Sequence, residues 1–216
     1  MYIPKQFAEG RPEVLQELIR TSPFGTLVTT TTDGLEASHI PFVLSPDPPP
    51  FGTLQGHLAR GNAQWHKSSL DQEALVIFLG PESYITPSWY PTKQETGKVV
   101  PTWNYVVVHA YGTLRVVEDP AWLQKHVEEL TDQQEHGREE PWAVSDAPVE
   151  FTSKLLGAIV GIEIAISRLL GKWKLGQNRS AEDQAGVLSG LQAQESPSAL
   201  AMARYLMSRD TPGSNR

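Results

Sequence analysis

The sequence predicts a mainly β protein with helices, in which an antiparallel sheet or barrel carries helices on its outside. About six or seven segments show the alternation or the continuous apolar run of a β-strand. Turns join most of them, and 17 prolines and 17 glycines supply residues for many turns. The alternating strand and helix pattern of a parallel sheet is absent. With 216 residues, we expect a single domain over 1–216.

The N-terminal part is expected to hold a helix followed by a β-hairpin. Apolar residues recur at helical spacing in residues 11–22, which predicts an amphipathic helix. Two β-rich runs follow in residues 24–45, joined by Asp33-Gly34, a strong hairpin signal. The prolines of residues 46–50 lack the N–H that strand pairing needs, so an exposed turn is expected before the next strand.

The middle of the chain combines strands with a long connection. A strand is expected over 51–58 and a short helix over 59–71. Residues 74–80, ALVIFLG, form a continuous apolar run, which predicts a strand buried on both faces. Residues 81–101 hold four prolines and three aromatic residues without a clear period, which is typical of a functional loop.

The stretch VPTWNYVVVHAYG, residues 100–112, alternates like a strand, but neither of its faces is made for water. The strand is expected to continue to about Glu118. Successive side chains point to opposite faces, so the two sets of side chains must be covered by different parts of the protein.

The remaining elements are helices around one more strand. The helix after this stretch has Asp119 as its expected N-cap and Gly137 at its C-terminus. Residues 157–178 return to strand alternation. C-terminal helices are expected from about residue 179, and the tail at 209–216 is expected to fray.

Composition excludes several classes of protein. The chain has no cysteine, so it has neither disulfides nor thiolate metal sites. The N-terminus lacks the pattern of a signal peptide, and no apolar segment is long and uncharged enough to span a membrane, so we expect a cytoplasmic protein. The net charge of −7 disfavours nucleic-acid binding, because such binding rests largely on Lys and Arg meeting phosphates.

Motif searches assign no catalytic residue. The sequence has no G-x-S-x-G, no H-E-x-x-H and no P-loop. The six histidines are widely spread, and no metal site is expected. On strands, His39, His57 and His109 are expected to be hydrogen-bonded core histidines. His126 and His136 are expected on a solvated helix surface.

The segment GHLARGNAQWHK has the features of an anion site. The end of the strand expected over 51–58, where His57 lies, feeds a helix start and offers backbone N–H groups, and Arg60 adds a planar fork of donors suited to phosphate. The alternative is that Arg60 forms a surface ion pair while Asn62 caps the helix.

Two further groups of residues suggest ligand binding. Lys172 and Lys174 share one face of an extended chain and could hold a phosphate or a partner's acidic groups, although plain solubility is the favoured explanation of the pair taken alone. Trp103, Asn104 and Tyr105 combine flat rings with polar groups, as sites for heteroaromatic ligands do. The alternatives are an aromatic core or a subunit interface.

Several motifs in order resemble the PaiB-like proteins, described as FMN-binding negative transcriptional regulators. The resemblance runs from Met1 to about Leu191. It is carried by the stretches MYIPKQF, GHLARGN, PSWYPTK, VPTWNYVVVHAYG, AIVGIEI and GKWKLGQN. Gly176 departs from the pattern, because it stands where serine is common.

The resemblance implies a six-stranded antiparallel split barrel with peripheral helices, which forms a homodimer with FMN near the subunit interface. It makes FMN the expected cofactor and implies a set of flavin-binding positions. These are Ser38, His39, His57, Arg60, Asn62, Trp103, Asn104, Tyr105, Lys172 and Lys174. The two lysines are expected to reach the flavin of the partner subunit.

Three functions fit the sequence. The resemblance implies a regulator that senses flavin or redox state, with DNA binding implied by the family but disfavoured by the net charge. The second is an FMN-dependent oxidoreductase of the flavin-reductase kind, without direct DNA binding. The third is a barrel that has lost its cofactor.

Overall fold

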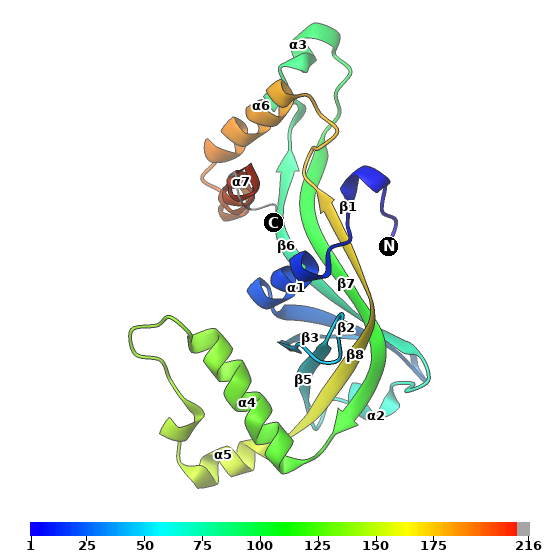
Figure 1. Ribbon diagram of the computed structural model, residues 1–216, viewed down its shortest axis with the longest axis vertical. Coiled ribbons are helices and arrows are strands. Elements are labelled where there is room, and N and C mark those ends of the chain that lie inside the picture. The colour runs from blue at the N-terminus through cyan, green and yellow to red at the C-terminus, as the bar shows by residue number, and fades with distance from the viewer. Residues whose placement is uncertain (211–216) are drawn as a thin grey trace. The chain divides into compact units, whose positions relative to one another are not determined.

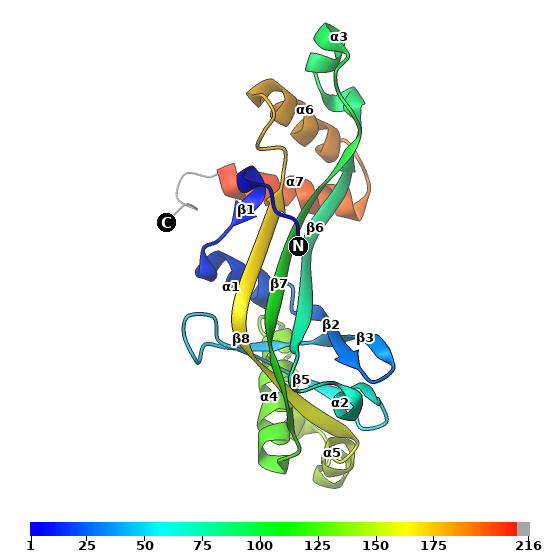
Figure 2. The same cartoon turned by 90° about the vertical axis from the view of Figure 1, so that its right-hand side faces the viewer.

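The computed structural model describes the backbone of residues 1–210, which divides into two compact units. Unit 1 comprises Met1–Glu9, Leu79–Val107 and Leu170–Arg216, and unit 2 comprises Gly10–Phe78 and Val108–Leu169. Three long strands contribute residues to both units (Figures 1 and 2): β6 (Glu73–Ile85), β7 (Thr102–Val117) and β8 (Ile159–Lys174). Whether the chain acts as the single domain expected from its length stays a prediction.

The strands form one eight-stranded sheet in the order β3-β2-β6-β7-β8-β5-β4, with β1 paired to β8. The shorter strands are β1 (Ala8–Glu9), β2 (Phe24–Thr31), β3 (Gly34–Pro41), β4 (Val43–Ser45) and β5 (Thr53–Ala59). Pairs such as β2–β3, β2–β6 and β5–β8 are antiparallel. The predicted class, a mainly antiparallel β protein with helices, is confirmed. The sheet has eight strands instead of six, because β1 and β4 are too short to show an alternation in sequence.

Unit 2 combines helices with the β2–β3 hairpin and with those parts of β6, β7 and β8 that belong to this unit. Its helices are α1 (Pro12–Thr21), α2 (Gln64–Lys67), α4 (Pro120–Glu135) and α5 (Val149–Leu156), with a 3-10 turn at Val144–Asp146. The apolar face of α1 is buried through Leu15, Leu18 and Ile19, as its helical spacing predicts. Asp119 caps α4 by accepting a hydrogen bond from the Trp122 N–H at 2.7 Å.

Unit 1 holds the C-terminal helices that the sequence predicts. They are α6 (Ala181–Gln192) and α7 (Pro197–Asp210), which lie side by side in Figures 1 and 2. Smaller elements are the 3-10 turns at Lys5–Phe7 and Pro87–Trp89 and the helix α3 (Thr92–Thr96). Of the tail expected to fray, Arg209 and Asp210 end α7, and residues 211–216 lie outside the described residues.

Strand β6 corrects two predictions. It continues through residues 81–85, which the sequence assigned to a loop. The proline at 81 is tolerated because β2 pairs with β6 only at Leu75–Ile77, so no β2 partner is present at that position. The run 74–80 is also not buried on both faces, since its burial alternates and Leu79 is 64% exposed.

None of the helices formed by residues 1–210 has both the length and the apolar character that a membrane span requires.

A close contact in unit 1 gives a stability prediction. A Cβ at Gly186 of α6 would lie 2.1 Å from the carbonyl oxygen of Trp89. We expect Gly186→Ala to lower the free energy of unfolding by about 1–3 kcal/mol, because overpacking outweighs the gain of roughly 1 kcal/mol in helix propensity. Thermal unfolding checks this. Gly10→Ala is the control, since nothing lies within 4 Å of a Cβ there. Equal midpoints for the two variants would contradict the contact.

Candidate functional site

A groove lies in unit 2 between strands β3 and β5. Residues 37–41 of β3 and 57–59 of β5 line it together with Asn62 and Ile159, and its volume is about 510 Å³. Within residues 1–210, β3 pairs only with β2, and β4 covers β5 only as far as Gln55. The backbone at the facing edges of β3 and β5 therefore keeps hydrogen-bonding groups for a ligand. We call this site the β3–β5 groove.

Four residues predicted from the sequence meet in this groove: Ser38, His39, His57 and Asn62. The Asn62 side chain holds two of the segments together, because its amide nitrogen donates to the Ser38 hydroxyl at 3.0 Å. Its amide oxygen accepts from the N–H of Gln64 at 2.9 Å and so shapes the start of α2. The Nδ1 atom of His39 lies 2.9 Å from the Thr26 hydroxyl, which orients the exposed imidazole and leaves its Nε2 atom for a ligand.

A second histidine, His126, contacts His57. The Nδ1 atom of His57 lies 3.1 Å from Nε2 of His126, and the His126 ring stacks on Trp122 at a centroid distance of 5.1 Å. His126 is only 1% exposed, so its expected place on a solvated surface is wrong. Burial lowers the pKa of both histidines, and in His126 the neighbouring His57 adds to the effect and the pKa falls to about 4. Both imidazoles are therefore neutral at pH 7.

The unsatisfied Nδ1 atom of His126 indicates the tautomers. This atom is buried and has no hydrogen-bond partner among residues 1–210. A buried N–H without an acceptor is rarer in proteins than an acceptor without a full set of donors. We therefore assign the proton of His126 to Nε2, from which it is donated to Nδ1 of His57. In consequence His57 carries its own proton on Nε2 and is a neutral hydrogen-bond donor.

The carboxylate of Glu163 holds the Trp122 ring on which His126 stacks. Glu163 of β8 accepts hydrogen bonds from Trp122 Nε1 at 2.9 Å, from Gln55 Nε2 at 3.1 Å and from Arg115 Nε at 3.0 Å. Burial alone raises the pKa of Glu163, but the donors Arg115, Gln55 and Trp122 outweigh it and hold the pKa below its ordinary value. Gly161 leaves room for the indole, because a Cβ there would lie 2.3 Å from the Trp122 ring.

Arg60 lies outside the groove lining. Its guanidinium donates to Glu118 at 2.7 Å and to the carbonyl oxygens of Gly157 and Ile159, each at 3.2 Å. The neighbouring backbone N–H groups of Arg60, Asn62 and Gln64 also have protein acceptors. The surface ion pair is thus the arrangement formed in the structure, and FMN contact by Arg60 stays a prediction.

The candidate residues of unit 1 form a separate cluster around Tyr105. Lys172 Nζ lies 5.2 Å from the centroid of the Tyr105 ring, and Lys174 Nζ lies 6.0 Å from it. Lys174 also donates to the Thr102 hydroxyl and, at 2.6 Å, to the carbonyl oxygen of Trp103. Burial lowers the pKa of Lys174, and nearby positive charges, Lys172 first, lower it further.

The remaining two candidates of unit 1 point to different surroundings. Trp103 is 50% exposed, with its ring 5.9 Å from that of Tyr84. Asn104, next in the strand, is 3% exposed and lines a different cavity. Alternation along β7 accounts for this separation.

The sequence did not identify three residues that connect to His57 through a series of contacts: Trp122, His126 and Glu163. A signal was present for two of them, because Trp122 and His126 are four residues apart on one helix and so lie on the same face. Within residues 1–210, no group of three or more His, Asp or Glu side chains is arranged to hold a metal ion.

Comparison with solved structures finds the same fold in other proteins. The flavocytochrome Anf3 of Azotobacter vinelandii matches with a TM-score of 0.60 and 13% identity, over 85% of this chain and 78% of that one. An FAD and heme binding protein of Mycobacterium smegmatis matches with a TM-score of 0.58 and 19% identity, over 82% of this chain and 78% of that one. At these identities the likeness shows the fold alone.

Comparison of sequences shows the family. Residues 1–168 match the model of a family described as "Putative FMN-binding domain". A Bacillus subtilis protein named protease synthase and sporulation protein PAI 2 is 34% identical over 95% of this chain and 96% of its own length. Protein AN0679 of Emericella nidulans is 41% identical over 89% and 90% respectively. The chain belongs to the PaiB-like family of FMN-binding proteins, and the predicted cofactor, FMN, is the one that this family binds.

The β3–β5 groove fits the uncharged part of FMN. Its lining offers the Ser38 hydroxyl, the neutral donor of His57 and two unpaired strand edges, which suit the carbonyl and nitrogen edges of a flavin ring. No Lys or Arg is among the residues that line it. The groove therefore accounts for the ring better than for the phosphate.

The neutral histidine pair gives a pH prediction. His126 has an ordinary pKa of 6.5 when unfolded and a pKa of about 4 when folded. The unfolded chain therefore takes up a proton first, and the stability that this residue contributes is complete above pH 6.5 and is lost as the pH falls toward 4. In an NMR titration we expect the His126 ring to stay neutral at pH 5.5. A midpoint for His126 at its ordinary value of 6.5 would contradict the burial of the pair.

Proposed function

We propose that this chain is an FMN-dependent redox protein whose β3–β5 groove binds the flavin. The observation that supports it best is the convergence of Ser38, His39, His57 and Asn62 on one groove at two free strand edges. These residues come from segments about twenty positions apart, and a barrel without a ligand at this point gains nothing from leaving both edges unpaired. Bound FMN supplies one- and two-electron chemistry.

The residues of the groove have distinct tasks in this proposal. His57, held neutral by His126, donates a hydrogen bond from Nε2 to a carbonyl or ring-nitrogen edge. Asn62 fixes the Ser38 hydroxyl and so orients a second donor. The free backbone edges orient the ring plane, and Ile40 and Ile159 exclude water from its apolar part.

The phosphate is proposed to be bound by a second copy of the chain, which makes the working protein a homodimer. Lys172 and Lys174 are two amines around one tyrosine ring, and such a pair suits a phosphate better than anything in the groove. Exposed apolar side chains of unit 1 favour a subunit contact, since Leu79 is 64%, Trp103 50% and Tyr84 47% exposed.

Regulation is the second candidate function. The relative from Bacillus subtilis is named as a sporulation protein, and it matches along 95% of this chain. Direct DNA binding is disfavoured by the net charge of −7. We therefore propose that any regulatory effect follows from the state of the flavin. Specific retardation of DNA by this protein in moderate salt would support the regulator with direct DNA binding instead.

The flavin site is tested by titrating the purified protein with FMN and following the visible absorbance. We expect His57→Phe to weaken FMN binding up to about tenfold, because it keeps a ring but removes a neutral donor with a net contribution of roughly 0.5–1.5 kcal/mol. His136→Phe, at an exposed histidine on the same unit, is the matched control and should bind like the wild type. Arg60→Gln should have a smaller effect than His57→Phe, since the donors of Arg60 are already engaged. The reverse order would place the flavin at Arg60 and outside the groove.

The redox function is tested by mixing the FMN-loaded protein with NADH or NADPH in a stopped-flow instrument. We expect one of them to bleach the oxidised flavin spectrum. An unchanged spectrum with both, while dithionite still reduces the flavin, would leave the cofactor assignment intact and remove the reductase proposal.

A further inference from the structure

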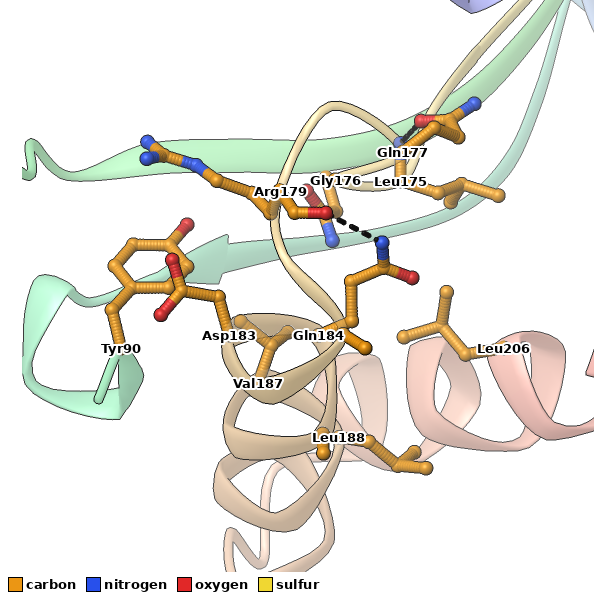
Figure 3. A pocket seen from close by; sticks show the side chains of 13 residues that line it. Tyr90, Leu175, Gly176, Gln177, Arg179, Asp183, Gln184, Val187, Leu188 and Leu206 are labelled. Atoms are coloured by element: carbon orange, nitrogen blue, oxygen red, sulfur yellow. Dashed lines mark hydrogen bonds between the residues drawn. The ribbon is translucent and has the colours of Figure 1, made fainter. Parts of the chain in front are cut away.

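Unit 1 contains a second cavity, which lies against helix α6 and which we call the α6 cavity. Its volume is about 350 Å³, at the small end of the range of about 300–1,000 Å³ for ligand pockets. In Figure 3, Arg179 and Tyr90 border one side, Val187 and Leu188 project from α6, and Leu206 projects from α7. None of the residues proposed for the flavin groove lines it.

Arg179 lines the cavity and has no ion-pair partner within the described residues. The Arg179 guanidinium carbon lies 4.7 Å from the centroid of the Tyr90 ring, which orients the cation without neutralising it. The charge of Arg179 also acts on Lys174. Burial lowers the pKa of Lys174 most, the charge of Lys172 lowers it further, and the charge of Arg179 is the third cause. An anion in the cavity would offset both charges.

An amide without a protein partner is a second feature of the lining. Asn104 of β7 is 3% exposed as a whole residue and lines the cavity, and its side chain makes no hydrogen bond within the described residues. Its amide atoms are not among the fully buried polar atoms that lack a partner, so they are accessible from the cavity. The amide is therefore free to engage a polar group of an occupant.

The rest of the lining limits the charge and shape of the occupant. Asp183 is 2% exposed and accepts from the Thr92 N–H at 3.2 Å. Its two oxygens also share the single proton of the Thr92 hydroxyl, at 2.9 and 2.8 Å. Its negative charge disfavours a dianion, and its engaged oxygens leave little for an ammonium group. Val187, Leu188 and Leu206 present an apolar wall to the body of a ligand.

We propose that the α6 cavity binds a small organic monocarboxylate. Its carboxylate pairs with Arg179, a fork of donors that matches that group, and a polar edge engages the Asn104 amide. Its apolar body packs on the wall formed by α6 and α7. Phosphate fits less well, because it carries more charge next to Asp183 and has no apolar part. This site is separate from the flavin and does not rest on the proposed redox function.

Isothermal titration calorimetry of the purified chain with benzoate and hexanoate tests the ligand class. We expect one of these carboxylates to bind with a stoichiometry of one per chain, and benzamide and inorganic phosphate to bind much more weakly. Absence of binding by both carboxylates overturns the proposal. Phosphate binding tighter than both carboxylates overturns the monocarboxylate assignment. The same titration on FMN-saturated protein separates the two sites, because the flavin spectrum reports the groove alone.

Variants locate the binding. Arg179→Gln should weaken carboxylate binding by about 10- to 100-fold, as expected for loss of a charge-assisted contact. Arg204→Gln is the matched control, because it removes one positive charge from an exposed position of α7 outside the lining. If thermal unfolding shows that Arg179→Gln disturbs the fold, Leu188→Glu replaces it, since a carboxylate on the apolar wall should repel the ligand. If a folded Arg179→Gln or Leu188→Glu variant still binds the carboxylate with wild-type affinity, the proposed site is wrong.

Discussion

The site of unit 2 depends on a half-buried carboxylate that must be neutralised within the sheet. Glu163 lies on β8 and needs donors, and it takes them from Gln55 of β5, Arg115 of β7 and Trp122 of α4. A carboxylate with these donors stays ionised despite its burial. Because the three donors come from three elements, one charge fixes the position of the helix against two strands.

The consequences of that charge reach the groove through a short series of contacts. Trp122 is held by Glu163, His126 stacks on Trp122, and His126 sets the tautomer of His57. The absence of a side chain at Gly161 provides the space for the indole. The chemistry available at the groove is thus determined mainly by residues that do not line it.

Local patterns in the sequence predicted much of the fold, because helix spacing, caps and strand alternation are local properties. The helix caps at Asp119 and Ser180 are examples. Partners that lie far away in the chain could not be predicted in the same way. Arg60 has the chemistry of a phosphate ligand, and local sequence does not show that its guanidinium pairs with a carboxylate 58 positions away and with two carbonyl oxygens. His126 has a polar side chain on an amphipathic helix, and only the tertiary position of Trp122 and His57 explains its burial.

The candidate site was predictable in part for the same reason. Ser38, His39, His57 and Asn62 came from the family resemblance, and the structure brings them into one groove. The resemblance could not reveal that the Asn104 side chain lies apart from those of Trp103 and Tyr105, which flank it in the sequence. That separation follows from alternation along β7, but which face meets which cavity depends on elements far away in the chain.

The two unpaired strand edges at the groove also affect how the protein behaves in the cell. An open edge is a template on which a strand of another molecule can add, and it is the usual starting point of aggregation in β proteins. Under the proposed function, a flavin bound in the groove would cover this template between β3 and β5. Loading with the cofactor would then also protect two open strand edges from pairing with another chain.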